Sequence, residues 1–431
     1  MFFSPKNLLL SAALLLSSPL LAQSGSSSRN PDRNDMEALR RWLQDKRMVS
    51  IKELGGDLSL SCEVRTEFQD TSEIYNGKEL RENIDGKPPR AWDVEVNIMI
   101  DYRTDRTWAN IKLEFDNDMG TMGGTDGKIK LERAYAGGRV IAGDTFTLDV
   151  EIGRRYLSVY DSKLQYGSRF DGVLLRFSKA FENIGDFYGT PGVVIVNDRF
   201  DHYAYVAEIG ALQIANTGLS LKYSTIYWYK NTHHLLPNRF RYCVAQFQPF
   251  YQFYPEWFNK RLIKIYAAGL YNMMAQRLRL PVADPADPAK ILLMDGNPVW
   301  KYLSRQNYGW YAGVAVGTVK KAGDWAVEAD FQWLQAQAVP DFDATGIGRG
   351  NSNRAGLFLL NQDTAPSLEN LTNITNAVGN GNFYGFEIDA LYAFTNNLTM
   401  EQNIKLSWTL DKDIGPDINY RQWEIEFIYA F

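Results

Sequence analysis

Apolar and polar residues alternate with a period of two along most of this chain. In the segment 91–103, one face collects Trp92, Val94, Val96, Ile98, Ile100 and Tyr102, and the opposite face collects charged and amide side chains. A period of two places successive side chains on opposite faces of a β-strand. The same alternation recurs over 107–118, 145–155, 324–336, 382–394 and 398–410. The pattern therefore predicts strands with one apolar and one polar face.

Sixteen such strands are expected. They cover 55–70, 90–103, 107–118, 128–137, 145–155, 170–182, 186–197, 202–213, 218–230, 240–253, 260–275, 307–320, 324–336, 382–394, 398–410 and 419–431. Short turns alternate with longer connections, which are 71–89, 119–127, 156–169, 231–239, 276–306 and 337–381. Because 276–306 and 337–381 are rich in Pro, Gly, Asn and Asp, we expect them to be irregular and mobile.

A water-soluble sandwich and a membrane barrel both alternate in this way. Three features favour the barrel. The strands are ten residues or longer, as a tilted crossing of a bilayer requires; their polar faces are heavily charged; and their apolar faces often begin or end in Trp or Tyr, as an interfacial girdle requires. The predicted fold is all-β, a closed antiparallel transmembrane β-barrel of sixteen strands with a short N-terminal periplasmic helix.

Composition narrows the functional classes. The 431 residues are 45% hydrophobic and 23% charged, as in a folded chain. The net charge of −5 argues against a nucleic-acid binder. After the N-terminus no apolar run approaches the roughly 18 residues of a membrane helix, which excludes a polytopic helical protein.

The N-terminal segment has the features of an export signal. Residues 1–22 combine a positive residue, Lys6, with an apolar stretch and a small-residue cleavage region, so they are expected to be removed. Residues 23–50 follow as a polar linker and an amphipathic helix, and 51–431 form the barrel. The helix is expected to rest at the barrel mouth, with a partial plug or an oligomer contact as the alternatives. Export places the mature chain in the periplasm, outer membrane or medium of a diderm bacterium, and the expected barrel favours the outer membrane.

The last strand carries the most specific pattern. It runs YRQWEIEFIYAF from Tyr420 to Phe431, with aromatic residues at alternate positions up to the final one. This resembles the C-terminal recognition strand of Gram-negative outer-membrane proteins. The resemblance implies that the barrel-assembly machinery reads Phe427, Tyr429 and Phe431. The alternative is an ordinary edge strand that ends in Phe.

Sixteen strands leave room for an aqueous channel, which the polar faces would line. The expected wall residues are Glu95, Asp101, Glu114, Asp149, Glu151, Glu328, Asp330, Glu387 and Asp389, with fewer cations such as Arg65, Lys112 and Lys405. Because rings of carboxylates favour cations, a mild cation preference is expected. The alternative is that these charges only solvate the lumen.

In size, strand count, loop asymmetry and terminal strand, the mature chain resembles bacterial general porins. In such porins the third external loop folds inward and narrows the channel. The third long connection here runs from Tyr156 to Arg169. The resemblance implies constriction residues Arg154, Arg155, Asp161, Lys163, Arg169 and Asp171; the alternative is that the loop lies outside. The N-terminal helix and the long late loops depart from the pattern and leave trimer formation in doubt.

The predicted function is passive diffusion of small hydrophilic solutes or ions through an outer-membrane porin. The expected partners are outer-membrane lipid, the barrel-assembly machinery, the solutes and a second copy in a homo-oligomer. No enzyme activity, cofactor or metal is predicted, since His202, His233 and His234 fit no catalytic or metal pattern.

Two alternatives stay open. Trp228 and Tyr311, aromatics that can face inward, suggest a porin selective for sugars. The long connections 276–306 and 337–381 suggest an adhesin or receptor.

Overall fold

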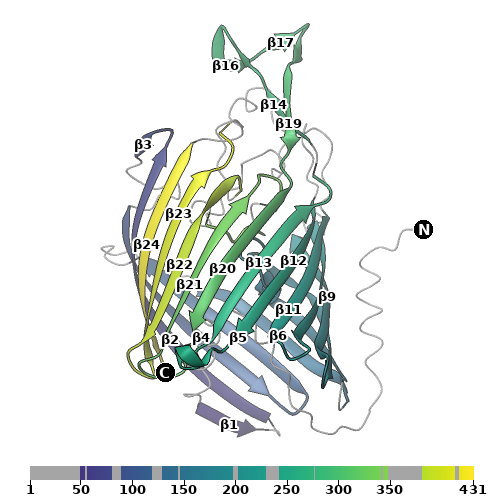
Figure 1. Ribbon diagram of the computed structural model, residues 1–431, viewed down its shortest axis with the longest axis vertical. Coiled ribbons are helices and arrows are strands. Elements are labelled where there is room, and N and C mark those ends of the chain that lie inside the picture. The colour runs from purple at the N-terminus through teal and green to yellow at the C-terminus, as the bar shows by residue number, and fades with distance from the viewer. Residues whose placement is uncertain are drawn as a thin grey trace, which may run out of the picture.

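Sixteen strands of the chain close into one antiparallel barrel (Figure 1). The computed structural model describes residues 49–53, 56–79, 89–118, 129–143, 146–197, 202–229, 242–275, 277–340, 343–347, 381–412 and 417–431. The barrel strands are β2 (Gly56–Tyr75), β4 (Arg90–Arg103), β5 (Thr107–Asp118), β6 (Ile129–Ala142), β7 (Phe146–Tyr156), β8 (Arg169–Phe181), β9 (Gly185–Asn197), β10 (His202–Ile214), β11 (Leu219–Tyr229), β12 (Tyr242–Phe253), β13 (Ile263–Asn272), β20 (Tyr308–Gly317), β21 (Trp325–Leu334), β22 (Phe383–Ala393), β23 (Leu398–Thr409) and β24 (Ile418–Ala430). The predicted all-β barrel and its sixteen strands are confirmed.

Each barrel strand pairs with the next along the chain, and the last returns to the first. β24 pairs with β2 from Glu63 opposite Ala430 to Tyr75 opposite Ile418. Closure removes the exposed sheet edge that would otherwise invite pairing with another chain. We call the end of the barrel that holds the C-terminus the turn end, and the opposite end the loop end (Figure 1).

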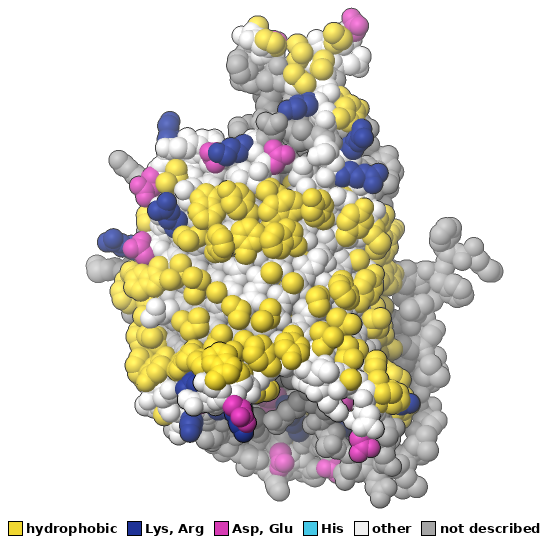
Figure 2. Space-filling model, viewed as in Figure 1, with side chains coloured by type: hydrophobic (Ala, Val, Ile, Leu, Met, Phe, Trp, Pro, Cys, Tyr) yellow, Lys and Arg dark blue, Asp and Glu magenta, His cyan; other side chains and the backbone are white. Residues whose placement is uncertain are grey.

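The two faces of the wall meet different surroundings. Large apolar side chains such as Ile209, Ile265 and Phe386 are exposed on the outside. Figure 2 shows hydrophobic side chains as a belt across the visible face of the barrel, with charged side chains gathered at its two ends. Inward positions carry buried polar residues such as Glu63, Asn97 and Gln332. This distribution is the reverse of that of a soluble protein, and it suits a wall with hydrocarbon outside and a polar lumen inside.

Aromatic side chains border the apolar belt at both ends. Near the loop end, Tyr308 contacts Trp333 with ring centroids 5.0 Å apart, and Tyr384 contacts Trp408 at 5.6 Å. Near the turn end the outward aromatics include Tyr392, Phe394, Phe427, Tyr429 and Phe431. The Tyr and Trp rings among them are amphipathic and suit the two interfaces of a bilayer.

The connection 276–306 is not irregular, which corrects the expectation from composition. β14 (Arg277–Pro281) and β19 (Trp300–Arg305) pair as a stem that projects from the loop end (Figure 1). Above the stem, β15 (Ala283–Asp284) pairs with β16 (Asp287–Ile291), and β17 (Leu293–Met294) with β18 (Asn297–Pro298). The turn Asp295-Gly296 has positive φ at both residues, so its Asp-Gly pair supports a tight hairpin there.

The remaining elements are short. β1 (Val49–Glu53) and β3 (Lys78–Glu79) pair with the two ends of β2. The described residues also include the 3₁₀ turns η1 (Leu157–Val159) and η3 (Glu256–Phe258). In the described part of the chain, no helix has the length and apolar character to cross a membrane. The predicted signal segment and amphipathic helix lie outside the described residues.

Candidate pore

The connection between β7 and β8 folds into the barrel. Leu157, Tyr160, Leu164 and Tyr166 of this inward loop (residues 157–168) are fully buried. The loop is closed at its base, where the Leu157 N–H donates to the Ser168 carbonyl at 2.9 Å. Hydroxyl groups then attach it to the wall: Tyr160 donates to the Thr190 carbonyl on β9 at 3.1 Å, and Tyr166 and Ser224 on β11 share a hydrogen bond of 2.8 Å.

A second segment, which follows β21, docks on the inward loop. The carboxylate of Asp343 accepts the backbone N–H groups of Tyr166 and Ser168, each at 3.1 Å, and its backbone carbonyl accepts the N–H of Gly167 at 2.9 Å. Thr345 adds a backbone bond to the Leu164 carbonyl at 3.2 Å. Because Asp343 is fully buried, this contact joins two segments that are far apart in sequence.

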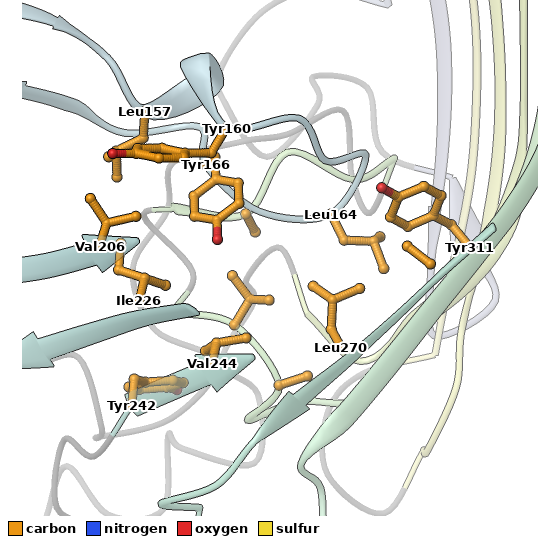
Figure 3. Close-up of a cluster of buried hydrophobic side chains, with 14 of the residues drawn as sticks. Leu157, Tyr160, Leu164, Tyr166, Val206, Ile226, Tyr242, Val244, Leu270 and Tyr311 are labelled. Atoms are coloured by element: carbon orange, nitrogen blue, oxygen red, sulfur yellow. The ribbon is translucent and has the colours of Figure 1, made fainter. Parts of the chain in front are cut away.

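These two segments pack against one side of the barrel interior. We call the inward loop with residues 336–340 and 343–347 the inward lobe. In Figure 3, Leu164 and Tyr166 face apolar side chains such as Ile226, Val244 and Leu270 of the wall. The apolar cluster draws on every strand from β8 to β13 and on β20, β21 and β22. The lobe therefore fills the part of the lumen next to these strands.

The packing of the lobe is close enough to require glycine. A Cβ atom on Gly346 would lie 2.4 Å from Phe383 Cζ and 3.0 Å from Leu164 Cδ2. Ile347, beside it, donates its N–H to the side-chain carbonyl of Gln332 on β21 at 3.0 Å. A side chain at position 346 would push the segment away from the wall.

Two charged residues fix the inward loop to two separate stretches of the barrel wall. The Asp161 carboxylate accepts from Lys222 Nζ on β11 at 3.3 Å and from Gln248 on β12 at 3.2 Å. Lys163 Nζ lies 2.9 Å from Glu328 and 3.3 Å from Asp330, both on β21. Since β21 stands eight strands from β7 in a barrel of sixteen, the loop crosses the whole lumen.

These partners also decide the charge states of the two loop residues. Burial alone would raise the pKa of Asp161, but Lys222 and Lys264 outweigh it and lower that pKa below its ordinary value. Burial alone would lower the pKa of Lys163, but Glu328 and Asp330 outweigh it and raise that pKa. Both residues are therefore charged at neutral pH.

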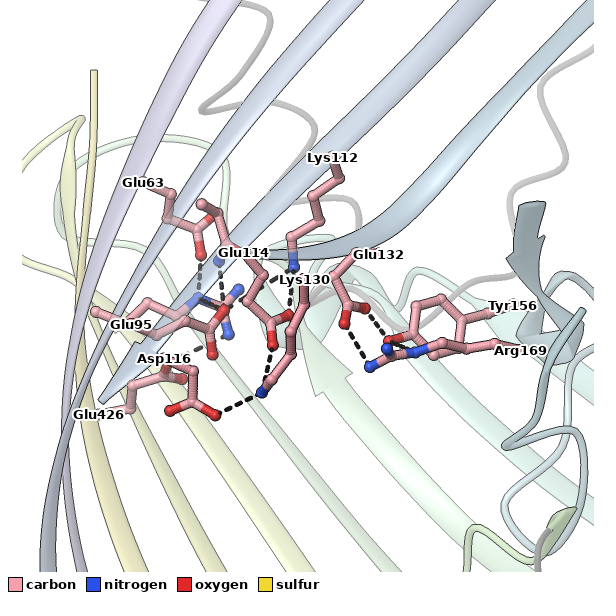
Figure 4. Close-up of polar contacts among 12 residues, drawn as sticks. Glu63, Glu95, Lys112, Glu114, Asp116, Lys130, Glu132, Tyr156, Arg169 and Glu426 are labelled. Atoms are coloured by element: carbon pink, nitrogen blue, oxygen red, sulfur yellow. Dashed lines mark hydrogen bonds and ion pairs between the residues drawn. The ribbon is translucent and has the colours of Figure 1, made fainter. Parts of the chain in front are cut away.

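The rest of the lumen is lined by charged side chains. Arg65 on β2 pairs with Glu63, with Glu426 at 3.2 Å and with Glu95 at 3.8 Å (Figure 4). Ion pairs continue around the wall, from Lys112 to Glu114 at 3.6 Å and from Lys130 to Glu114 at 3.3 Å and Asp116 at 2.9 Å. Such pairs hold the side chains against the wall.

The predicted wall residues fall on inward positions. Asp101 accepts from Asn110 at 2.7 Å, Asp149 from Arg139 at 2.8 Å, and Glu151 from Trp108 at 3.2 Å as well as from Arg155. Asn403 on β23 donates to Glu387 at 3.1 Å and to Asp389, both on β22. Glu95, Glu114, Glu328 and Asp330 make the contacts described above.

A cavity of about 280 Å³ lies against this charged wall. It is lined by residues of β2, β4, β5, β23 and β24 alone, namely Arg65, Glu67, Gln69, Asp93, Glu95, Asp116, Lys405, Gln422, Glu424 and Glu426. Six of the ten are carboxylates and two are cations. The lumen is thus divided between a packed, mainly apolar side and a charged side that holds the cavity.

The six constriction candidates do not share one location. Asp161 and Lys163 lie inside the lumen on the inward loop, and Arg155 faces inward beside Glu151. Arg169 pairs with Glu132 and hydrogen-bonds Tyr156 at 2.6 Å at the loop end of the wall. Arg154 and Asp171 pair with each other at 2.8 Å on the outward face, the face of Ile152 and Val173, so they do not line the lumen.

Trp228 and Tyr311 face inward, but both are almost completely buried in the apolar cluster beneath the lobe. Their rings do not form an open surface along the cavity. Cys62 and Cys243 are free thiols. Across the described ranges, no group of His, Cys, Asp and Glu side chains is placed to hold a metal ion. His233 and His234 lie outside these ranges.

The residues missed from the sequence belong mostly to the second segment of the lobe. Asp343 sits in a connection whose composition indicated an irregular loop; the apolar residues Ala336, Ala338 and Val339 were the signal for burial. Lys130 was missed because a bulge in β6, opposite Lys112 and Leu113, shifts the alternation. Beyond a bulge, taking every second residue no longer identifies the side chains on one face of the strand. Arg139 was missed because β6 extends to Ala142, beyond the expected end at 137.

Comparison with known proteins bears on the fold. No family model and no curated protein matches the sequence. Among solved structures, OprB of Pseudomonas putida aligns over 92% of this chain and 97% of its own, with 12% identity and a TM-score of 0.51. A mutant of the Rhodopseudomonas blastica porin (87% and 100% covered, 10% identity, TM-score 0.41) and OmpT, an outer-membrane protein of Vibrio cholerae (89% and 100%, 11%, 0.44), also align. The alignment with OprB shows that this chain has the fold of a bacterial outer-membrane porin.

Proposed function

We propose that the protein is an outer-membrane channel through which small hydrophilic solutes and ions diffuse passively along the charged side of its lumen. The observation that supports this proposal most directly is that the lumen is divided into a packed, mainly apolar side and a charged side. The inward lobe packs against β8–β13 and β20–β22, while the cavity touches only β2, β4, β5, β23 and β24. Water and small polar solutes are accommodated by the second wall, where charged and amide side chains line the cavity.

The charge of that wall supports a mild cation preference. Six of the side chains that line the cavity are carboxylates and two are cations, Arg65 and Lys405. Lys112 and Lys130 pair with two of these carboxylates, Glu95 and Asp116, from beside the cavity. An excess of fixed carboxylates raises the local concentration of cations and repels anions. Asp161, Lys163, Arg155 and Arg169 are the proposed constriction residues; Arg154 and Asp171 are left out because they lie on the outward face.

Charge reversal on the wall tests the selectivity. Asp149→Lys with Glu151→Lys should move the reversal potential in a salt gradient towards anions, because both side chains face the lumen. The matched control is Glu182→Lys with Glu256→Lys, which makes the same change in charge at exposed turns of the turn end. An unchanged reversal potential in the lumen variant would refute the placement of these two β7 carboxylates along the conducting lumen. Asp149→Asn with Glu151→Gln gives a smaller shift of the same sign if the lysines prevent assembly.

The sugar-selective alternative relied on Trp228 and Tyr311 as an aromatic surface in the lumen, but the lobe covers both side chains. It is tested by adding sugar to the same bilayers, where a concentration-dependent block would favour it. The extension above β14 and β19 supports the receptor alternative, because Leu293 and Met294 are exposed at its tip. A bilayer that stays sealed in the presence of the folded protein would favour that second function.

Outer-membrane lipid, the barrel-assembly machinery and a second copy of the chain are the further partners that we propose. The outward aromatics Phe427, Tyr429 and Phe431 support the first two, since they are 41%, 44% and 48% exposed on the last strand.

A further inference from the structure

Two arginines lie directly opposite each other in the stem of the projecting extension. Arg277 on β14 is the register partner of Arg305 on β19, and both side chains are exposed. Directly opposed residues in an antiparallel pair share one face, with Cβ atoms about 5 Å apart, and like charges there destabilise the pair. Within the described ranges, no carboxylate forms an ion pair with either guanidinium. An anion between them would relieve the repulsion.

The height of this pair along the barrel is set by outward aromatics. Tyr271 and Tyr308, which are register partners, and Trp310 are 48%, 46% and 41% exposed at the loop end of β13 and β20. Such rings mark the boundary between hydrocarbon and headgroups. Arg305 precedes Tyr308 by three residues, about 10 Å of extended chain. The headgroup layer is about 5–8 Å deep on each side, so a long Arg side chain reaches it.

We infer that Arg277 and Arg305 form a binding site for a phosphate monoester at the headgroup level of the loop end. Two guanidinium groups can each donate paired hydrogen bonds to phosphate oxygens, a geometry that lysine does not provide. Lys301, also exposed on β19, adds positive charge four residues away. The site depends on the barrel lying in a membrane and not on its conducting, so it can fail or hold independently of the proposed function.

The phosphate can belong to a lipid headgroup or to a free anion, and one titration separates these sources. Full-length protein in detergent is titrated with bisphosphorylated lipid A, with the same lipid lacking its phosphates, and with inorganic phosphate as competitor; binding is followed by native mass spectrometry. The variant is Arg277→Gln with Arg305→Gln. The control, Lys320→Gln with Lys321→Gln, removes the same charge from an exposed turn at the turn end.

The expected result is that the arginine variant binds the bisphosphorylated lipid about tenfold more weakly than the wild type, the loss expected for one or more charge-assisted hydrogen bonds. The lysine control should bind as the wild type does, and Arg277→Lys with Arg305→Lys should fall in between. Displacement of the lipid by millimolar inorganic phosphate would show that a free anion suffices, whereas retention would assign the site to the headgroup. Equal affinity of wild type and arginine variant, or equal binding of the lipid without phosphates, would overturn the inference.

Discussion

Lys163 joins the inward loop to the wall at the far side of the barrel. Its ammonium group lies among the carboxylates of Glu328, Asp330 and Asp389, at 2.9, 3.3 and 3.9 Å. It therefore both positions the loop and neutralises part of the acidic wall. On the cavity side, Arg65 also neutralises wall carboxylates, because Glu63, Glu95 and Glu426 surround its guanidinium group.

Replacing Lys163 by Gln should increase cation preference. The change leaves the wall carboxylates without their ammonium partner, and the cation-to-anion permeability ratio should rise roughly twofold. Reversal potentials in a salt gradient measure this ratio. Lys260→Gln is the matched control, because its side chain is 72% exposed at the turn end and carries the same charge. A lower ratio in Lys163→Gln than in the control would contradict this role.

Asp343 makes the contact between the two segments of the lobe sensitive to pH. Burial raises the pKa of Asp343 to about 7, although the N–H groups of Ser168 and Tyr166 act in the opposite direction. The docked state thus holds a proton that a solvated carboxyl, with a pKa near 4, has lost. Docking is therefore strongest below about pH 4 and weakens as pH rises towards 7, because the docked state binds more protons over that range.

Hydrogen exchange can detect this pH dependence. After correction for intrinsic exchange rates, protection of the Tyr166 and Ser168 amides should fall as pH rises from about 4, the pKa of a solvated carboxyl, to about 7, the pKa of docked Asp343. Asp343→Asn should abolish that dependence, since an amide does not titrate. Protection that stays constant in the wild type, or that rises with pH, would show that Asp343 is ionised throughout.

At the scale of elements, the lobe is held by apolar packing as well as by its charged anchors. Leu164→Ala should destabilise the packing by about 2–5 kcal/mol, because the residue is fully buried in the cluster. A loosened lobe should widen the path, so single-channel conductance should increase or become noisier. Leu131→Ala serves as the control, since Leu131 is 41% exposed on the outward face. Equal conductance in the two variants would show that packing of the lobe does not set the width of the pore.

The strands were the most predictable part of the molecule. In β4 and β5 the expected bounds, 90–103 and 107–118, match the structure, because both faces of each strand alternate without a break. β6 was harder, since its bulge near Arg133 interrupts the alternation. β2 extends to Tyr75 beyond the expected end at 70, because β3 and β24 continue to pair with it.

The lobe was less predictable, and the reason is physical. Strand patterns report which face of each segment meets lipid, but contacts such as Asp343 with Tyr166 join residues whose proximity no local periodicity encodes. Asp161 and Lys163 were proposed only through the resemblance to porins. The stem of β14 and β19 was missed because its strands have only five and six residues, shorter than the ten or more residues expected of a strand that crosses the membrane.

At the scale of the whole molecule, closure of the barrel depends on the C-terminal residue. The backbone N–H of Phe431 donates to the Cys62 carbonyl and its carbonyl accepts the Cys62 N–H, both at 2.9 Å. The side chain is 48% exposed on the outward face, where it contacts Tyr429 with ring centroids 5.8 Å apart. Phe431 thus belongs to both the closing seam and the aromatic border.

Phe431→Ser should lower the amount of assembled barrel in the outer membrane several-fold, because the proposed assembly signal loses its aromatic end. Phe431→Tyr keeps the ring and should assemble as the wild type does. Fractionation of cells followed by immunoblotting measures the membrane-inserted and the soluble periplasmic pools. If Phe431→Ser assembles as well as the wild type, the backbone pairing of the seam suffices for assembly without the aromatic ring.

The most direct test of the proposed path is the current through a planar bilayer that holds the purified wild-type protein between unequal concentrations of potassium chloride. Discrete, stable current steps are predicted, with a reversal potential whose sign shows that potassium crosses more readily than chloride, because carboxylates dominate the cavity wall. A sealed bilayer would contradict an open pore. A reversal potential of the opposite sign would contradict a path along the acidic wall.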